Sequence, residues 1–170
     1  CDERAARILE SGLRVTLCGR PNVGKSSLLN ALLGEERAIV TSVAGTTRDV
    51  ITGELQLDGL LVKFYDTAGL HEAGDQVEQI GIARAEKALR EADVVLLTLD
   101  GSRPLTAEDR ALLSRAYEGK LIVLLNKADL PAQVVTAEVQ KLAPHAEMLV
   151  VSAHDARTLQ PLKQRLSALA

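Results

Sequence analysis

The chain has 170 residues, of which 46% are hydrophobic and 25% charged, and its net charge at pH 7 is −3. This usage is typical of a single globular domain and argues against disorder. The acidic balance and the small number of aromatic residues argue against a domain that binds nucleic acid by itself. Two cysteines are too few for a disulfide scaffold or a four-ligand zinc site. Neither a signal peptide nor an apolar run of roughly 18 residues is visible, so we expect a cytoplasmic protein without membrane contact.

Apolar runs and helical patterns alternate along the chain. They predict strands at 13–18, 51–57, 60–65, 94–99, 121–125 and 148–151, and helices at 26–33, 80–91, 106–117, 134–142 and 158–169. Asp58-Gly59 is a hairpin signal between the second and third strands. The unbroken apolar runs 94–99 and 121–125 are typical of a parallel sheet covered on both faces. We therefore expect a doubly wound α/β fold, with a mostly parallel six-stranded sheet, one antiparallel strand and helices on both faces.

Residues 19–26 (GRPNVGKS) fit the phosphate-binding pattern G-x-x-x-x-G-K-[ST], and they lie between a predicted strand and a predicted helix. Backbone N–H groups at a helix N-terminus supply the many short-range donors that phosphate oxygens need. Lys25 is expected on the outer phosphates, and the Ser26 hydroxyl on Mg²⁺. The candidate nucleotide ligands of this loop are Asn22, Val23, Gly24, Lys25, Ser26 and Ser27.

Residues 126–129 (NKAD) directly follow the apolar strand 121–125. A carboxylate at Asp129 can accept hydrogen bonds from the ring N–H and the amino group of guanine together, whereas adenine offers no such pair of donors. Asn126 and Lys127 belong to the same loop, where Asn126 is expected to brace it and reach the base. After the last strand, Ser152 and Ala153 are expected to offer backbone N–H groups to the guanine oxygen. The pattern therefore predicts GTP or GDP as the nucleotide.

Two further segments are typical of nucleotide-sensing switches. Asp66 ends a predicted strand and is expected to hold Mg²⁺ through water, while Gly69 allows a backbone N–H to meet the γ-phosphate. Thr46 and Thr47 end a long segment without periodicity. A hydroxyl at Thr47 would ligate Mg²⁺ only when a γ-phosphate draws the loop inward, which makes the segment a switch.

The chain starts at Cys1 instead of Met and stops directly after an apolar helical run. We interpret it as part of a longer protein, with residues 1–12 as a tail from a preceding domain and residues 13–170 as the GTP-binding domain. Cys18 lies inside the first predicted strand and is expected to be a small core residue.

On these motifs the chain resembles the G domain of the MnmE (TrmE) tRNA-modification GTPases. The resemblance rests on residues 19–30, 39–41, 44–49, 66–70 and above all 75–82 (DQVEQIGI). The first two blocks are shared with bacterial GTPases of the Der and Era type. The resemblance implies a P-loop GTPase (Ras-like) fold and hydrolysis of GTP that drives modification of the tRNA wobble uridine. It also implies GTP/GDP, Mg²⁺ and K⁺ as cofactors.

The family further implies that two G domains pair across their switch regions and that K⁺ takes the place of an arginine finger. Its K⁺ ligands match Asn22, Thr41, Val43 and Thr46, and its catalytic glutamate matches Glu78. The implied partners are a second G domain, the flavoprotein MnmG and tRNA, the last two through domains outside this chain. His154 stands where these proteins usually carry lysine.

Two alternatives stay open at this point. One is a ribosome-assembly GTPase of the Der or Era type, which shares the first motif blocks. The other is a nucleotide-gated scaffold that hydrolyses GTP too slowly to matter. Leu70 favours the scaffold, because many relatives have a water-orienting glutamine at this position, whereas Glu78 together with Asn22 argues against it.

Overall fold

The structure, a computed structural model, describes residues 2–19, 25–33, 53–57, 59–66, 86–127, 130–133 and 136–169. In chain order its elements are α1 (Asp2–Ser11), β1 (Leu13–Cys18), α2 (Lys25–Leu33), β2 (Gly53–Leu57), β3 (Leu60–Asp66), β4 (Val94–Asp100), α4 (Ala107–Ser114), β5 (Lys120–Asn126), α5 (Thr136–Leu142), β6 (Glu147–Val150), the 3₁₀ helix η3 (Ala156–Leu159) and α6 (Gln160–Ala168). Residues 86–91 are also helical.

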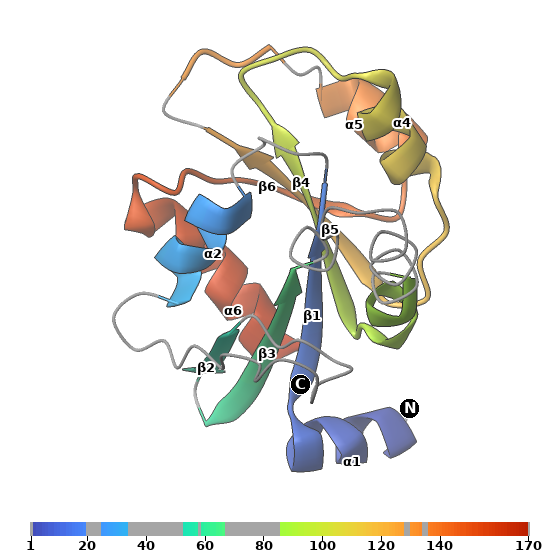
Figure 1. The fold of residues 1–170 in the computed structure, drawn as a ribbon, viewed down its shortest axis with the longest axis vertical. Helices are drawn as coiled ribbons and strands as arrows, with labels where there is room; N and C mark the ends of the chain where they lie inside the picture. The colour runs from blue at the N-terminus through green and yellow to red at the C-terminus, as the bar shows by residue number, and fades with distance from the viewer. Residues whose placement is uncertain are drawn as a thin grey trace, which may run out of the picture.

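The six strands form one sheet in the order β2-β3-β1-β4-β5-β6 (Figure 1). β2 and β3 pair antiparallel across the predicted hairpin, and every other neighbouring pair is parallel. The predicted fold class is therefore confirmed. Because five strands run the same way, their carboxyl ends lie along one edge of the sheet, where nucleotide sites of such folds occur.

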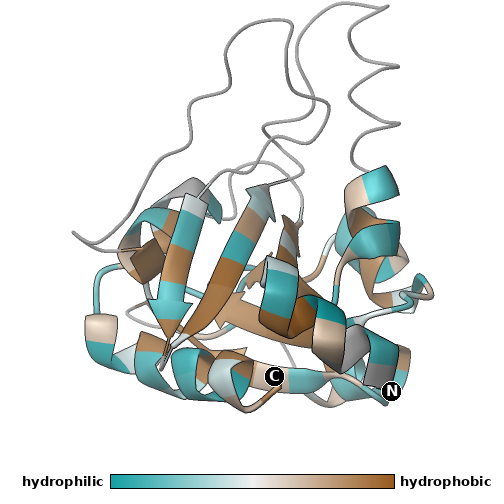
Figure 2. Ribbon diagram, turned by 90° about the horizontal axis from the view of Figure 1, so that it is seen from below, coloured by the Kyte–Doolittle hydropathy of each residue, from teal (hydrophilic) through white to brown (hydrophobic). Residues whose placement is uncertain are grey.

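Alternating side chains of the central strands fill two hydrophobic layers, one on each face of the sheet. Val94, Leu96, Ile122 and Leu124 pack with the helices α1, α2 and α6, whereas Val95, Leu97, Leu99, Val123 and Leu125 pack with residues 86–91, α4 and α5. Figure 2 shows the hydrophobic colour concentrated on the strands between these helices. Burial on both faces explains why these strands appear in the sequence as unbroken apolar runs. Cys18 is buried in the second layer as a small core residue, as predicted.

α1 is a helix that the sequence patterns did not predict. Its Ile8 is buried with the first layer, and its Arg7 forms an ion pair with the buried Asp93 just before β4. Gly12 ends the helix in the left-handed region (φ 95°), with its N–H donating to the Ile8 carbonyl at 2.8 Å. Residues 2–11 thus pack on the domain through both an apolar and a charged contact.

α4 begins as predicted but ends three residues early. Thr106 caps its N-terminus, because its hydroxyl accepts from the Asp109 N–H while the Asp109 carboxylate accepts from the Thr106 N–H. The helix was expected to reach residue 117 and instead ends at Ser114. The Tyr117 hydroxyl donates to the Leu112 carbonyl at 2.7 Å and so satisfies one of the acceptors that the last turn exposes.

Other predicted boundaries moved by a few residues. The last strand is residues 147–150 instead of 148–151, and the last helix is split into η3 and α6. Asp155 caps the start of η3, because its carboxylate accepts from the Arg157 N–H. Residues 80–85 and 134–135 of the predicted helices lie outside the described residues.

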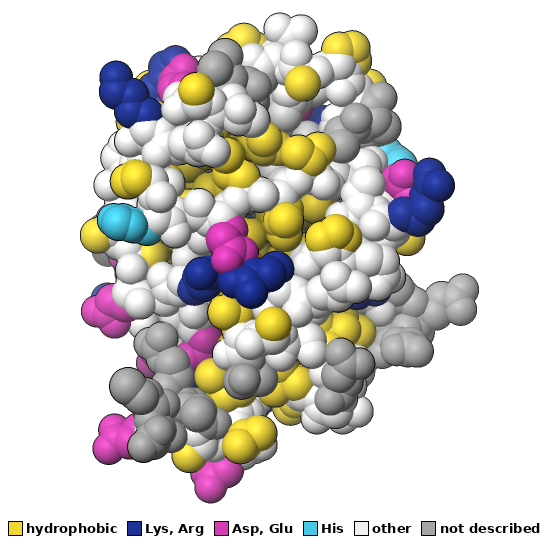
Figure 3. All heavy atoms as spheres, turned by 180° about the vertical axis from the view of Figure 1, so that it is seen from behind, with side chains coloured by type: hydrophobic (Ala, Val, Ile, Leu, Met, Phe, Trp, Pro, Cys, Tyr) yellow, Lys and Arg dark blue, Asp and Glu magenta, His cyan; other side chains and the backbone are white. Residues whose placement is uncertain are grey.

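β6 is an edge strand of the sheet, and its Val150 is 60% exposed. Figure 3 shows the side of the molecule opposite to that of Figure 1, where hydrophobic side chains lie across the middle and charged ones interrupt them. In β6 the carboxylate of Glu147 accepts hydrogen bonds from Arg165 and forms an ion pair with Lys120. Within the described ranges, the helices are all too short or too polar to cross a lipid bilayer.

Candidate nucleotide site

The residues predicted to bind the nucleotide follow the carboxyl ends of four parallel strands. Gly19 comes directly after β1, Asp66 ends β3, Asn126 ends β5, and Ser152 lies two residues beyond β6. A hydrogen bond from the Val151 N–H to the Leu125 carbonyl, at 2.9 Å, ties the segment after β6 to β5. The fold therefore gathers the phosphate, magnesium and base motifs along one edge.

Lys25 is the first residue of α2, and its ammonium donates to the Gly19 carbonyl at 2.6 Å. The residue is only 6% exposed. Gly19 has φ 141°, a backbone conformation that residues other than glycine rarely adopt. A desolvated ammonium beside a helix N-terminus is a favourable place for an anion, and this arrangement fits the terminal phosphates of a nucleotide.

The residues expected at Mg²⁺ also start from this edge. The backbone of Ser26 lies in the first turn of α2, and that of Asp66 at the end of β3. Hydroxyl and carboxylate oxygens are the protein ligands that Mg²⁺ prefers, so the donor set fits the metal. In the described part of the chain, no cluster of three or more His, Cys, Asp or Glu side chains could hold a metal by itself.

The predicted base loop begins with a buried asparagine and an unusual backbone. Asn126 is 2% exposed, and Lys127 has φ 64°, a left-handed conformation that costs a non-glycine residue about 1–3 kcal/mol. Three backbone hydrogen bonds hold the loop: the Gly101 N–H to the Asn126 carbonyl (2.9 Å), the Leu130 N–H to the Lys127 carbonyl (2.9 Å) and the Gln133 N–H to the Gly101 carbonyl (2.8 Å). The loop is thus fastened to the end of β4.

The side chain of Lys127 is held by a residue that the sequence analysis missed. Its ammonium lies 3.0 Å from Asp100 Oδ2, and the Asp100 carboxylate also accepts from the N–H and hydroxyl of Ser102. Burial alone raises the pKa of Asp100, but the hydrogen bonds from Ser102 and Lys127 outweigh it and hold the pKa below its usual value. The only sequence signal was an aspartate at the end of an apolar strand.

The segment after β6 forms a compact turn. The Ser152 N–H donates to Thr158 Oγ1 at 2.8 Å, and the His154 N–H donates to Ser152 Oγ at 3.2 Å. In the described part of the chain, no group accepts from the Ala153 N–H. Of the two residues expected at the guanine oxygen, Ala153 therefore offers the available backbone donor.

The remaining candidate site residues lie outside the described residues: Asn22, Val23, Gly24, Thr41, Val43, Thr46, Thr47, Gly69, Glu78 and Asp129. Ser27 is described and is exposed on α2. The roles assigned to these residues stay predictions.

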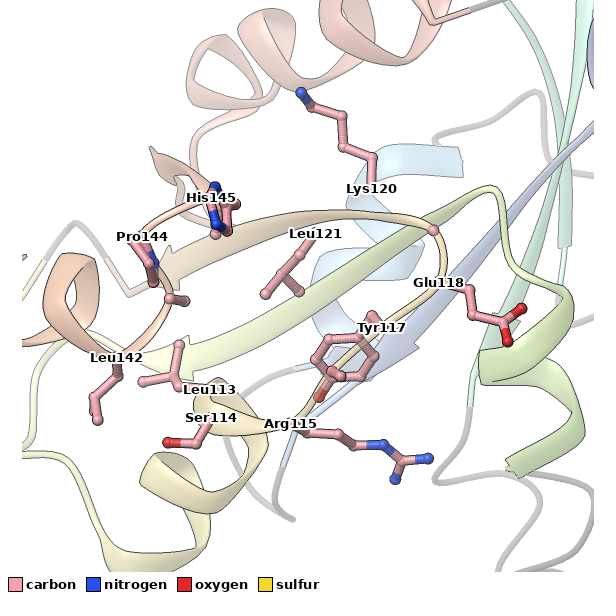
Figure 4. Close-up of a pocket in the computed structure, with 14 residues that line it drawn as sticks. Leu113, Ser114, Arg115, Tyr117, Glu118, Lys120, Leu121, Leu142, Pro144 and His145 are labelled. Atoms are coloured by element: carbon pink, nitrogen blue, oxygen red, sulfur yellow. The ribbon is translucent and has the colours of Figure 1, made fainter. Parts of the chain in front are cut away.

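A cavity of about 550 Å³ lies elsewhere, lined by residues 113–121 and 142–146 (Figure 4). β5 and β6 begin beside these residues, so the cavity belongs to the amino ends of the strands and not to the nucleotide edge. Arg115 covers the ring of Tyr117 at 5.7 Å from its centroid and also pairs with Glu86. Burial raises the pKa of the Tyr117 hydroxyl.

Sequence comparison extends the likeness over nearly the whole chain. The family model of 50S ribosome-binding GTPases matches residues 14–127. The chain is 48% identical to the tRNA modification GTPases MnmE of Lactiplantibacillus plantarum and Enterococcus faecalis, and 47% identical to that of Streptococcus pneumoniae. Each match covers 98% of this chain, whereas the chain spans only 35–36% of the length of these relatives.

Solved structures agree with the fold. Era in complex with MgGDPNP and a segment of 16S ribosomal RNA superposes with a TM-score of 0.69 at 30% identity, covering 90% of this chain and 55% of Era. The G domain of T. maritima FeoB superposes with a TM-score of 0.66 at 24% identity, covering 92% of this chain and 98% of that domain. The second likeness concerns the fold alone.

The two sequence comparisons confirm the resemblance that the motifs indicated, and a GTPase of this kind binds GTP or GDP with Mg²⁺. The chain belongs to the 50S ribosome-binding GTPase family, and 98% of it is similar to part of the tRNA modification GTPases MnmE.

Proposed function

We propose that residues 13–170 are the GTP-hydrolysing domain of a longer protein that takes part in modification of the tRNA wobble uridine. The observation that carries the GTPase part is the Lys25 ammonium, which is held at Gly19 beside the N-terminus of α2 and on the same edge as Asn126 and Lys127. The observation that carries the tRNA part is the identity of 46–48% to proteins named tRNA modification GTPase MnmE.

In this proposal the phosphates lie against the backbone of residues 22–27, with Lys25 on the outer phosphates. Ser26, Thr47 and, through water, Asp66 would hold Mg²⁺, which neutralises charge on the phosphate oxygens. Gly69 and Thr46 contribute backbone contacts on the γ-phosphate side. Hydrolysis then consists of attack by water on the γ-phosphorus, with GDP as the leaving group.

Guanine specificity is assigned to Asp129, supported by Asn126, Lys127 and the Ala153 N–H. The test is Asp129→Asn, which replaces one acceptor with a donor. This variant should lose affinity for GDP and gain preference for xanthosine nucleotides, whose base carries an acceptor at that position. Unchanged preference for guanine, measured by competition binding, would reject the assignment.

The attacking water needs a partner other than residue 70, because the side chain of Leu70 carries no polar group. We assign this role to Glu78, which acts through a bridging water since a carboxylate next to a triphosphate is repelled. Glu78→Ala should lower kcat by about 10²–10⁴-fold and change GTP affinity only a few-fold. Glu72→Ala and Asp75→Ala are the matched controls. Normal turnover by Glu78→Ala, with slow turnover by either control, would move the assignment to that control residue.

K⁺ is proposed to supply the positive charge that an arginine finger gives other GTPases, with Asn22, Thr41, Val43 and Thr46 as its ligands. Hydrolysis should therefore be faster in K⁺ than in Na⁺ at equal ionic strength, because the smaller Na⁺ fits a K⁺-sized ring of oxygens poorly. Asn22→Ala should abolish the difference and leave binding of Mg²⁺-GTP mostly intact. Equal rates in the two salts would remove K⁺ from the mechanism.

A second G domain is proposed to complete the site across the switch regions. The domain should be a monomer with GDP and a dimer with GDP and aluminium fluoride in K⁺. Sedimentation velocity distinguishes the two states. A monomer under the second condition would contradict pairing, and with slow turnover in both salts it would favour the nucleotide-gated scaffold.

The full-length protein decides between the two cellular roles. We propose the flavoprotein MnmG and tRNA as its partners, through parts outside this chain. The alternative, a role in ribosome assembly, is favoured by the description of the family model and by the likeness to Era. Deletion of the gene should remove the wobble-uridine modification, measured by mass spectrometry of tRNA nucleosides. Normal tRNA together with accumulated ribosomal RNA precursors would support the alternative.

A further inference from the structure

The carboxylate of Asp100 is built into the end of β4 and is 3% exposed. Its Oδ1 accepts two hydrogen bonds from Ser102, one from the N–H (2.9 Å) and one from the hydroxyl (2.5 Å). Its Oδ2 accepts from the Lys127 ammonium at 3.0 Å. Because the two bonds from Ser102 fix the rotation of the carboxylate, Oδ2 is directed at Lys127.

Lys127 is the residue at which the base loop turns. It follows the last residue of β5, and its φ of 64° is strained for any residue other than glycine. Such a conformation persists only where the surroundings hold it in place. The backbone bonds to Asn126 and Leu130 hold one side of the turn. The Asp100 contact holds the side chain.

The contact joins two neighbouring strands at the edge where the nucleotide is proposed to bind. Asp100 and Asn126 are register partners in the β4–β5 pair, and the Gly101 N–H donates to the Asn126 carbonyl. A second cation, Arg103, lies 3.9 Å from Asp100 Oδ2 and is 74% exposed. At that distance and exposure it contributes little, so Lys127 is the main cationic partner of Asp100.

We propose that Asp100 is a positioning residue for guanine recognition, which acts by holding Lys127, and with it the turn that begins the proposed base loop, in the geometry that the base requires. This inference rests on the proposed function, because it presumes that the loop binds guanine. Asp100 itself need not touch the nucleotide.

The experiment is a measurement of GDP and IDP affinity for the 170-residue chain and its variants. Asp100→Asn keeps an oxygen for Ser102 and turns an NH₂ group toward the ammonium, so a donor faces a donor. Loss of a charge-assisted hydrogen bond should weaken GDP binding about tenfold or more. The preference for GDP over IDP should also fall, since IDP lacks the amino group that the loop is proposed to recognise. Arg103→Ala, the matched control, should change neither quantity.

A double-mutant cycle tests whether Asp100 acts through Lys127. In the background of Lys127→Met, Asp100→Asn should cause little further loss of affinity. Additive losses would overturn the proposal, as would an equal loss for GDP and IDP, which a general loss of structure would produce.

The outcomes also separate this inference from the proposed function. If the unaltered chain does not bind GDP, the proposed function fails. If it binds GDP and Asp100→Asn binds equally well, the inference alone fails. If Asp100→Asn does not fold, Ser102→Ala replaces it, because that variant removes one of the two hydrogen bonds that fix the carboxylate and should weaken GDP binding about threefold. Unchanged binding by Ser102→Ala would then refute the inference.

Discussion

The clearest test of the fold concerns α1, because no sequence pattern indicated that residues 2–11 pack on the domain. Ile8 is 4% exposed in the first hydrophobic layer, whereas its neighbour Leu9 is 80% exposed. Both are apolar residues of the same helix, so alanine substitutions at the two positions remove similar volumes from different surroundings. Leu9→Ala is therefore the matched control for Ile8→Ala.

The expected magnitude follows from the carbons removed. Ile8→Ala deletes three buried carbons, which together contribute about 2.4 kcal/mol of transfer free energy at ~0.8 kcal/mol each. The cavity left behind adds to this loss, and the better helix propensity of alanine returns a few tenths of a kcal/mol. We expect Ile8→Ala to lower the free energy of unfolding by about 2–3 kcal/mol. Leu9→Ala should change it by less than about 0.5 kcal/mol.

Urea unfolding, followed by circular dichroism at 222 nm, measures both values. The denaturation midpoint of Ile8→Ala should fall with the slope unchanged, because the same surface is exposed on unfolding. If both variants unfold at the midpoint of the unaltered chain, α1 does not pack as described. Residues 1–12 would then behave as the predicted tail and not as part of the folded domain.

Three further predictions concern single side chains. Thr98→Val should raise the free energy of unfolding by about 1 kcal/mol, because Thr98 Oγ1 is buried in β4 with no hydrogen-bond partner in the described structure; a lower midpoint in urea would contradict this. Thr106→Ala should lower that free energy by about 1 kcal/mol through loss of the capping box with Asp109, and an unchanged midpoint would show that the cap is unimportant. Hydrogen bonding to Arg165 lowers the pKa of Glu147 despite burial, so this pair stabilises the fold fully above about pH 5, and the effect is lost as pH falls through the lowered pKa. Glu147→Gln should therefore flatten the acid side of the stability profile, and equally steep profiles would refute that.

The sheet could be predicted because its signals are local. The apolar runs of β4 and β5 and the Asp58-Gly59 turn are each visible within a few consecutive residues, and the structure contains all six strands. The phosphate and base motifs were visible for the same reason. Their strand contexts then placed them on one edge.

What the sequence could not predict depends on contacts between distant residues. α1 carries a single buried hydrophobic side chain among the described ones, and its ion pair joins Arg7 to a residue 86 positions away. The early end of α4 coincides with pairing of Arg115 to Glu86, 29 residues earlier. Asp100 meets Lys127 across 27 residues. No local pattern of polarity reports such pairs, because each partner alone looks like an ordinary charged surface residue.

The two ends of β4 show how similar residues can serve different purposes. Asp93 precedes the strand and is 5% exposed; it binds the Arg14 N–H at 2.9 Å and the guanidinium of Arg7, so its contacts join α1 and β1 to β4. Asp100 ends the strand and binds Lys127 and Ser102, so its contacts stay within the proposed base site. Loss of the first carboxylate therefore acts on the free energy of unfolding, because packed elements lose their attachment. Under the proposal above, loss of the second acts on nucleotide affinity, because Lys127 at the start of the proposed base loop is its main cationic partner.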